Sequence, residues 1–131
     1  MTNITEDYVS FETAKLLKEK GFDGECRDYY NTVGHFYSED FKSDWNDSKG
    51  EITFFSAPTL QMAMKWLREV HKLYVEVYIV KNHSNKTIEY CITIEDLNFP
   101  GNKDGFHIRP SQESYEDACK VAIKYCLEHL I

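Results

Sequence analysis

Two runs of alternating residues, separated by a short polar segment, constrain the fold of this chain more than any other feature. Residues 73–80, LYVEVYIV, place leucine, valine or isoleucine at every second position, and residues 88–94, IEYCITI, alternate isoleucine and tyrosine with other residues. A period of two residues is typical of a strand with one buried face. Because only residues 81–87, KNHSNKT, separate the runs and KNHSNK can form the loop, we expect them to form an antiparallel β-hairpin.

An amphipathic helix is predicted directly before this hairpin, in the stretch APTLQMAMKWLREVH at residues 57–71. Pro58 would lie in its first turn, where the missing N–H costs no hydrogen bond, and His71 at its C-terminal end, where a positive charge suits the helix dipole. Apolar positions cover more than half of the helical circumference, so we expect a central core helix. The expected core residues are Leu60, Met62, Ala63, Met64, Trp66, Leu67 and Val70. The narrow polar edge consists of Gln61, Lys65, Arg68 and Lys72.

Shorter elements complete the predicted order. Ser10 and Ser114 are candidate N-caps for helices at residues 10–20 and from residue 115 to the C-terminus. Further strands are expected at residues 26–30, 35–38 and 52–55, and a loop at residues 97–110. The result is an α+β fold in the order α-β-β-(β)-α-β-β-α, with three helices on one face of an antiparallel sheet of four to five strands that contains two hairpins. We expect residues 1–131 to form a single domain.

A possible internal repeat leaves two interpretations open. The segments KLLKE at residues 15–19 and KWLRE at residues 65–69 align at an offset of 50, and each lies in a helix before a predicted hairpin. They are either remnants of a duplicated unit or two amphipathic helices that share a pattern by chance. We favour chance, because helical periodicity alone produces such matches.

Composition indicates a folded and acidic chain. Hydrophobic residues make up 42% and aromatic residues 15%, values that exclude the disordered classes. The net charge is −7, and residues 1–56 hold six Lys and Arg against twelve Asp and Glu, which disfavours binding to nucleic acid or to anionic membranes. Neither an apolar run of ~20 residues nor a signal-peptide pattern occurs, so we expect a cytoplasmic protein without a membrane partner. In that compartment its four cysteines are expected to be buried thiols, not disulfides.

Three segments carry a resemblance to known proteins. They are SFETAKLLKEKGF, SAPTLQMAMKWLREVHKLYVEV and SYEDACKVAIKYCLEHLI. Together they resemble a group of short uncharacterised proteins of Bacteroides-group gut bacteria, often encoded among phage or mobile-element genes. The group has no assigned activity, so the resemblance implies a bacterial or phage context and no residue roles.

No pattern in the chain predicts catalysis, a metal or a cofactor. The stretch DWNDSKGE at residues 44–51 begins like a calcium loop, but Lys49 and Phe55 stand where glycine and a bidentate glutamate are required. Neither a glycine-rich phosphate loop nor an activated cysteine is recognisable. We therefore assign no catalytic residue, metal ligand or cofactor.

Two binding functions remain. We expect a non-catalytic protein-interaction or regulatory module, and Trp45 is its candidate contact unless this residue folds back over the core. The alternative is a weak nucleic-acid-binding accessory protein that uses a basic helix edge beside strand tyrosines. Its candidate residues are Lys65, Arg68, Lys72, Tyr74 and Tyr78. Neither the partner nor the oligomeric state follows from the sequence.

Overall fold

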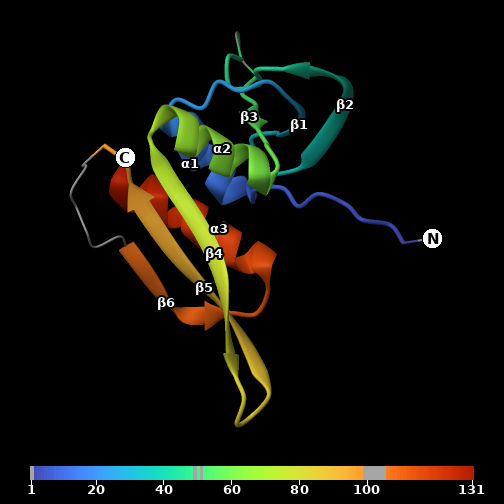
Figure 1. Cartoon of the computed structure of the whole chain (residues 1–131). Helices are drawn as coiled ribbons and strands as arrows, with labels where there is room; N and C mark the ends of the chain where they lie inside the picture. Colours follow the sequence, from blue (N-terminus) through green and yellow to red (C-terminus); the bar gives the residue numbers. More distant parts are fainter. Residues whose placement is uncertain (1, 49, 51, 99–105) are drawn as a thin grey trace.

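The computed structural model describes residues 2–48, 50, 52–98 and 106–131, and in this part the chain contains three α-helices and six strands (Figure 1). The helices are α1 (Phe11–Glu19), α2 (Leu60–Val70) and α3 (Tyr115–Tyr125), the last followed by a π-helical turn, Cys126–Leu130. The strands are β1 (Cys26–Tyr30), β2 (Phe36–Ser43), β3 (Phe55–Ser56), β4 (Leu73–Asn82), β5 (Thr87–Asp96) and β6 (Phe106–Gln112). The predicted α+β class is confirmed.

The strands divide into two antiparallel sheets, ordered β2-β1-β3 and β4-β5-β6, where the sequence analysis expected one. Alternation within a strand identifies its buried face but not its neighbours, so the division could not be predicted. Strand β6 lies in the segment 97–110 that was predicted to be a loop, of which residues 99–105 lie outside the described residues. Pro110 suggested a loop, but proline is tolerated in an edge strand such as β6.

The helix N-termini depend on hydroxyl caps. The Ser10 and Ser114 hydroxyl oxygens accept hydrogen bonds from backbone N–H groups three residues later, at 3.2 and 3.1 Å, as predicted. Helix α2 has a cap of the same kind, but the helix begins later than predicted. Its N-cap is Thr59, whose hydroxyl accepts from the N–H of Met62 at 3.1 Å. Pro58 therefore lies before the helix and not in its first turn.

The core lies where α1, α2 and α3 pack together and against the second sheet, and Figure 1 shows α3 crossing behind β4 and β5. Most of the predicted core residues of α2 are buried: Leu60, Ala63, Met64, Trp66 and Leu67. Two predictions were wrong, because Val70 is 58% and Met62 40% exposed. Val70 ends α2 and projects beyond the packed turns, while Met62 lines a cavity on the side of the first sheet.

The two helix-hairpin units differ in topology. In the first sheet the third strand, β3, pairs with β1, which is the first strand of its hairpin. In the second sheet β6 pairs with β5, which is the second strand of its hairpin. A duplicated unit would keep the same neighbours, so the structure favours a chance likeness between residues 15–19 and 65–69.

Candidate functional site

The two faces of the first sheet are covered in different ways. Helix α1 packs on one face, where the Phe11 ring lies 5.6 Å from the rings of both Tyr30 and Phe55. Tyr29 points to the opposite face, because successive strand residues alternate between faces. There it contacts Trp45 and Phe54, which follow β2 and precede β3 in the chain. This second face is therefore covered by aromatic side chains from the loop and not by a helix.

Trp45 folds back onto the sheet. Its indole N–H donates a hydrogen bond to the carbonyl oxygen of Cys26 at 2.6 Å, and its ring centroid lies 4.2 Å from that of Tyr29. The Phe41 and Phe54 rings flank it at 5.6 and 6.1 Å. Of the two interpretations of Trp45, the packing role is confirmed, although the side chain stays half-exposed and can also contact a partner.

Several rings around Trp45 are open to solvent. Tyr37 stacks on Tyr29 at 5.6 Å, and Phe41 is 58% exposed. We call this surface the aromatic face; its members are Tyr29, Tyr37, Phe41, Trp45 and Phe54. Contiguous exposed apolar surface of this kind often marks an interaction site.

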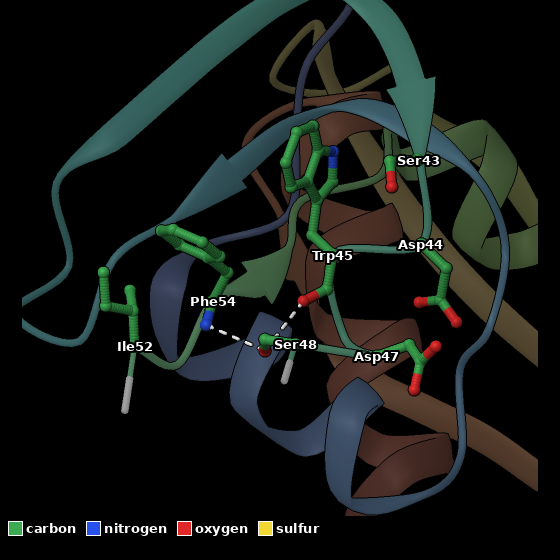
Figure 2. Close-up of a pocket in the computed structure, with 7 residues that line it drawn as sticks. All are labelled: Ser43, Asp44, Trp45, Asp47, Ser48, Ile52 and Phe54. Atoms are coloured by element: carbon green, nitrogen blue, oxygen red, sulfur yellow. Dashed lines mark hydrogen bonds between the residues drawn. The ribbon is translucent and has the colours of Figure 1, made fainter. Parts of the chain in front are cut away.

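A cavity of about 530 Å³ opens at one end of the aromatic face (Figure 2). Its lining residues are Ser43, Asp44, Trp45, Asp47, Ser48, Ile52 and Phe54. Figure 2 shows Phe54 and Ile52 on one side of Ser48, and the carboxylates of Asp44 and Asp47 on the other. The cavity thus combines an apolar wall with an acidic one.

Side-chain hydrogen bonds hold the loop that forms this cavity. The Ser48 hydroxyl donates to the Trp45 carbonyl and accepts from the N–H of Phe54, both at 3.1 Å. The Asn46 amide oxygen accepts from the N–H of Ser56 at 2.9 Å. The Asp44 carboxylate also accepts from the N–H of Asn46 at 3.1 Å, so each of the three residues of the calcium-like pattern has an oxygen occupied by a protein donor. The described residues contain no cluster of metal-ligating side chains.

The acidic wall lacks counter-ions within the described part of the chain. Neither Asp44 nor Asp47 takes part in an ion pair there. The ammonium group of Lys18 reaches the same loop, but it donates to the Phe54 carbonyl at 3.0 Å and to the Ser48 hydroxyl at 3.5 Å. Together with the acid excess of residues 1–56, this arrangement makes the cavity attractive to a positively charged group.

The predicted basic edge of Lys65, Arg68 and Lys72 is exposed, but two of its three cations contact Glu69 near the end of α2. The Lys65 ammonium lies 4.0 Å from the Glu69 carboxylate, and the Lys72 ammonium donates to the Glu69 carbonyl at 2.9 Å. Lys72 also lies beyond the helix, in the left-handed region with φ of 57°. Arg68 is exposed, and none of the ion pairs in the described residues includes it.

The predicted stacking tyrosines lie on an acidic sheet face. Tyr74 is exposed and Tyr78 half-buried, and both lie on the face of β4 that also carries Glu76. Pairing with β5 adds Glu95 opposite Tyr74 and Glu89 opposite Val80. Three carboxylates around the tyrosines would repel the phosphates of a nucleic acid.

The titratable groups of the core favour neutral forms. All four cysteines are free and buried, as predicted. Burial raises the pKa of Cys26 and that of Cys119. It raises the pKa of Cys126 to about 12. These three thiols therefore stay protonated at neutral pH and are poor nucleophiles. Burial lowers the pKa of His71, so the charged form expected at the end of α2 is disfavoured.

Sequence reasoning identified Trp45 and missed the rings around it. A usable signal exists in the spacing of Tyr37, Phe41 and Trp45, which are four residues apart. In extended chain such positions share one face. The strand was predicted to end at residue 38, but β2 continues to Ser43 with an irregular pairing to β1, and Trp45 lies in the turn that follows. The spacing alone therefore could not establish the shared face.

Comparisons of the chain with protein-family models, with curated proteins and with solved structures return no significant match. Within the described residues, none of the helices combines the length and apolar character needed to cross a bilayer. Function is therefore inferred from the geometry of the site itself.

Proposed function

We propose that this protein is a non-catalytic protein-interaction module whose aromatic face and adjoining cavity bind a basic segment of a partner protein. The observation that carries the proposal is a cavity in which the half-buried rings of Trp45 and Phe54 lie beside two carboxylates, Asp44 and Asp47, that lack ion pairs among the described residues. The exposed rings of Tyr37 and Phe41 extend this aromatic surface. In keeping with the sequence resemblance, we place this activity in the cytoplasm of a bacterium or in a phage-infected host.

The chemistry of the site matches lysine or arginine side chains. An ammonium or guanidinium group can lie over the Trp45 or Phe54 ring and donate charge-assisted hydrogen bonds to the nearby carboxylates. Aromatic residues also dominate the binding energy of many protein interfaces, because they bury large rigid surfaces. The acid excess of the first 56 residues would accelerate the encounter with a basic partner.

The raised thiol pKa values support a non-catalytic role. Burial raises the pKa of Cys26, Cys119 and Cys126, which makes these three thiols poor nucleophiles. Nucleic-acid binding through Lys65, Arg68, Lys72, Tyr74 and Tyr78 is less favoured. Glu69 engages two of the cations, and glutamates surround the tyrosines.

Peptide binding tests the proposal directly. A fluorescein-labelled peptide of alternating arginine and leucine is titrated with the protein, and its anisotropy is followed over a series of salt concentrations. A glutamate-leucine peptide of equal length is the charge control. We expect the arginine peptide alone to bind, with an affinity that falls as salt rises.

Variants locate the binding site on the protein. Asp44→Asn/Asp47→Asn should weaken binding about fivefold, from roughly 0.5 kcal/mol for each exposed ionic contact. Glu19→Gln/Asp23→Asn removes the same charge from exposed positions outside the cavity and should change affinity much less. Equal losses in both double variants would mean that net charge, not this site, attracts the peptide. Salt-sensitive binding of RNA or DNA that is lost in Lys65→Glu/Arg68→Glu would support the nucleic-acid alternative instead.

A further inference from the structure

A second cavity, of about 200 Å³, lies between the segment before α1, strand β1 and the start of α2. Backbone hydrogen bonds fix its walls: the N–H of Val9 donates to the Pro58 carbonyl at 3.1 Å, and the N–H of Leu60 donates to the Asp7 carbonyl at 2.9 Å. An isolated antiparallel bridge joins Tyr8 to Thr59 beside them. The cavity is therefore a built part of the fold.

Asp28 is the unusual residue of this cavity. It lines the cavity although the residue is only 8% exposed, and within the described residues its carboxylate belongs to no ion pair. Tyr8 lines the same cavity, and burial of its phenol, followed by the charge of the nearby Asp28, raises the pKa of Tyr8. The hydroxyl therefore remains a donor at neutral pH. A carboxylate has about four acceptor positions, so the neighbouring Tyr8 hydroxyl leaves most of them available to a ligand in the cavity.

The cations near the cavity form no ion pair with Asp28 within the described residues. Arg27 lines the cavity too, although it precedes Asp28 in β1 and its side chain starts on the opposite face of the strand; its Nε donates to the Glu39 carbonyl at 3.0 Å. Lys42 also lines the cavity but is exposed, as is the acidic Glu25. A buried carboxylate without a counter-ion is costly, and a bound cation would remove that cost.

The rest of the lining supplies an apolar wall. Pro58 is fully buried, and Met62 is 40% exposed beside it although it belongs to a mainly apolar helix. Assuming about 30 Å³ for each water molecule, the cavity has room for roughly six or seven, which matches a small ligand with a short hydrocarbon chain. Such a ligand would place its charge against Asp28 and its chain along Pro58 and Met62.

We propose that this cavity binds a small primary amine. Its ammonium group donates to the Asp28 carboxylate and to the Tyr8 hydroxyl oxygen, and its hydrocarbon chain contacts Pro58 and Met62. The site lies apart from the aromatic face: Asp28 and Tyr29 are neighbours in β1 and point to opposite faces of the strand. It therefore does not depend on the proposed protein partner.

An NMR titration of the ¹⁵N-labelled full chain tests this assignment with three probes that share a four-carbon chain: n-butylammonium chloride, 1-butanol and sodium butyrate. We expect saturable amide shifts around Asp28 and Met62 with the ammonium probe alone. Equal shifts with butanol would reduce the site to an apolar crevice, and stronger shifts with butyrate would assign it to Arg27 and Lys42. Both results, and the absence of any saturable shift, would overturn the proposal.

Two variants and one control complete the test. Asp28→Asn keeps the shape of the side chain and should abolish ammonium binding, while Tyr8→Phe should weaken it severalfold and keep the ring contact with Phe36. Asp40→Asn makes the same chemical change at an exposed position of β2 and should bind like the unmodified protein. If Asp28→Asn does not fold, Tyr8→Phe decides the matter. Unchanged ammonium affinity in whichever of the two variants folds would contradict the assignment.

Discussion

The substitution Trp45→Phe separates the two roles of the tryptophan in the aromatic face. It retains a ring against Tyr29 but removes the indole N–H that donates to the Cys26 carbonyl at 2.6 Å. Loss of one hydrogen bond costs about 0.5–1.5 kcal/mol, and about 1–3 kcal/mol if the carbonyl is left buried without a partner. We therefore expect the free energy of unfolding to fall by about 1–2 kcal/mol.

Urea unfolding measures this change. The chain has two tryptophans, so the fluorescence of the Trp45→Phe variant reports on Trp66 in the core, and far-ultraviolet circular dichroism provides an independent probe. Linear extrapolation of both signals gives the free energy of unfolding, and an unchanged slope would show that the denatured state is not altered. Tyr37→Phe is the control, because it removes only the hydroxyl of an exposed ring and should stay within about 0.5 kcal/mol of the unmodified protein.

If Trp45→Phe and Tyr37→Phe unfolded at the same urea concentration, the expected loss of stability in Trp45→Phe would be contradicted. That result would mean that the indole N–H is not held against the Cys26 carbonyl and that the loop does not fold back onto the sheet. The walls of the 530 Å³ cavity would then lack their support, and the proposed binding site would lose its structural basis.

Two further predictions concern α2. Leu67→Ala removes a fully buried side chain and should lower the free energy of unfolding in urea by about 2–5 kcal/mol. Val70→Ala, at a position 58% exposed, should lower it by less than about 1 kcal/mol. Similar losses in the two variants would mean that the last turn of α2 is misplaced. Because burial lowers the pKa of His71 below its unfolded value, its neutral form contributes stability that is complete above pH ~6.5 and is lost as the pH falls through the lowered folded pKa. His71→Phe keeps a ring against Trp66, so its stability should vary less than that of the unmodified protein between pH ~7 and ~5; parallel curves would exclude a titrating His71.

Elements with local causes could be predicted from the order of the amino acids. Alternation at residues 73–80 and 88–94 placed the long hairpin, which the structure extends to Leu73–Asn82 and Thr87–Asp96. The hydroxyls of Ser10 and Ser114 located two helix starts, because a cap acts on N–H groups only two or three residues away. The α+β class followed from the order of these elements.

Which surfaces are covered depends on contacts between elements that are distant in the chain. Helical periodicity assigned Val70 and Met62 to the core, but burial also requires a neighbour at that height of the helix, and neither residue has full cover. The choice between one sheet and two depended on which strand edges meet, which a two-residue period does not encode.

The same distinction applies to the candidate site. Trp45 stood out in the sequence as an aromatic residue in a charged segment, but its place on Tyr29 depends on a contact with a residue 16 positions earlier in the chain. Asp28 gave no signal at all, since a carboxylate in a short strand looks solvent-exposed until the segment before α1 and the start of α2 close around it. Local pattern therefore determined the elements of this protein, and long-range packing determined the cavities at Trp45 and at Asp28.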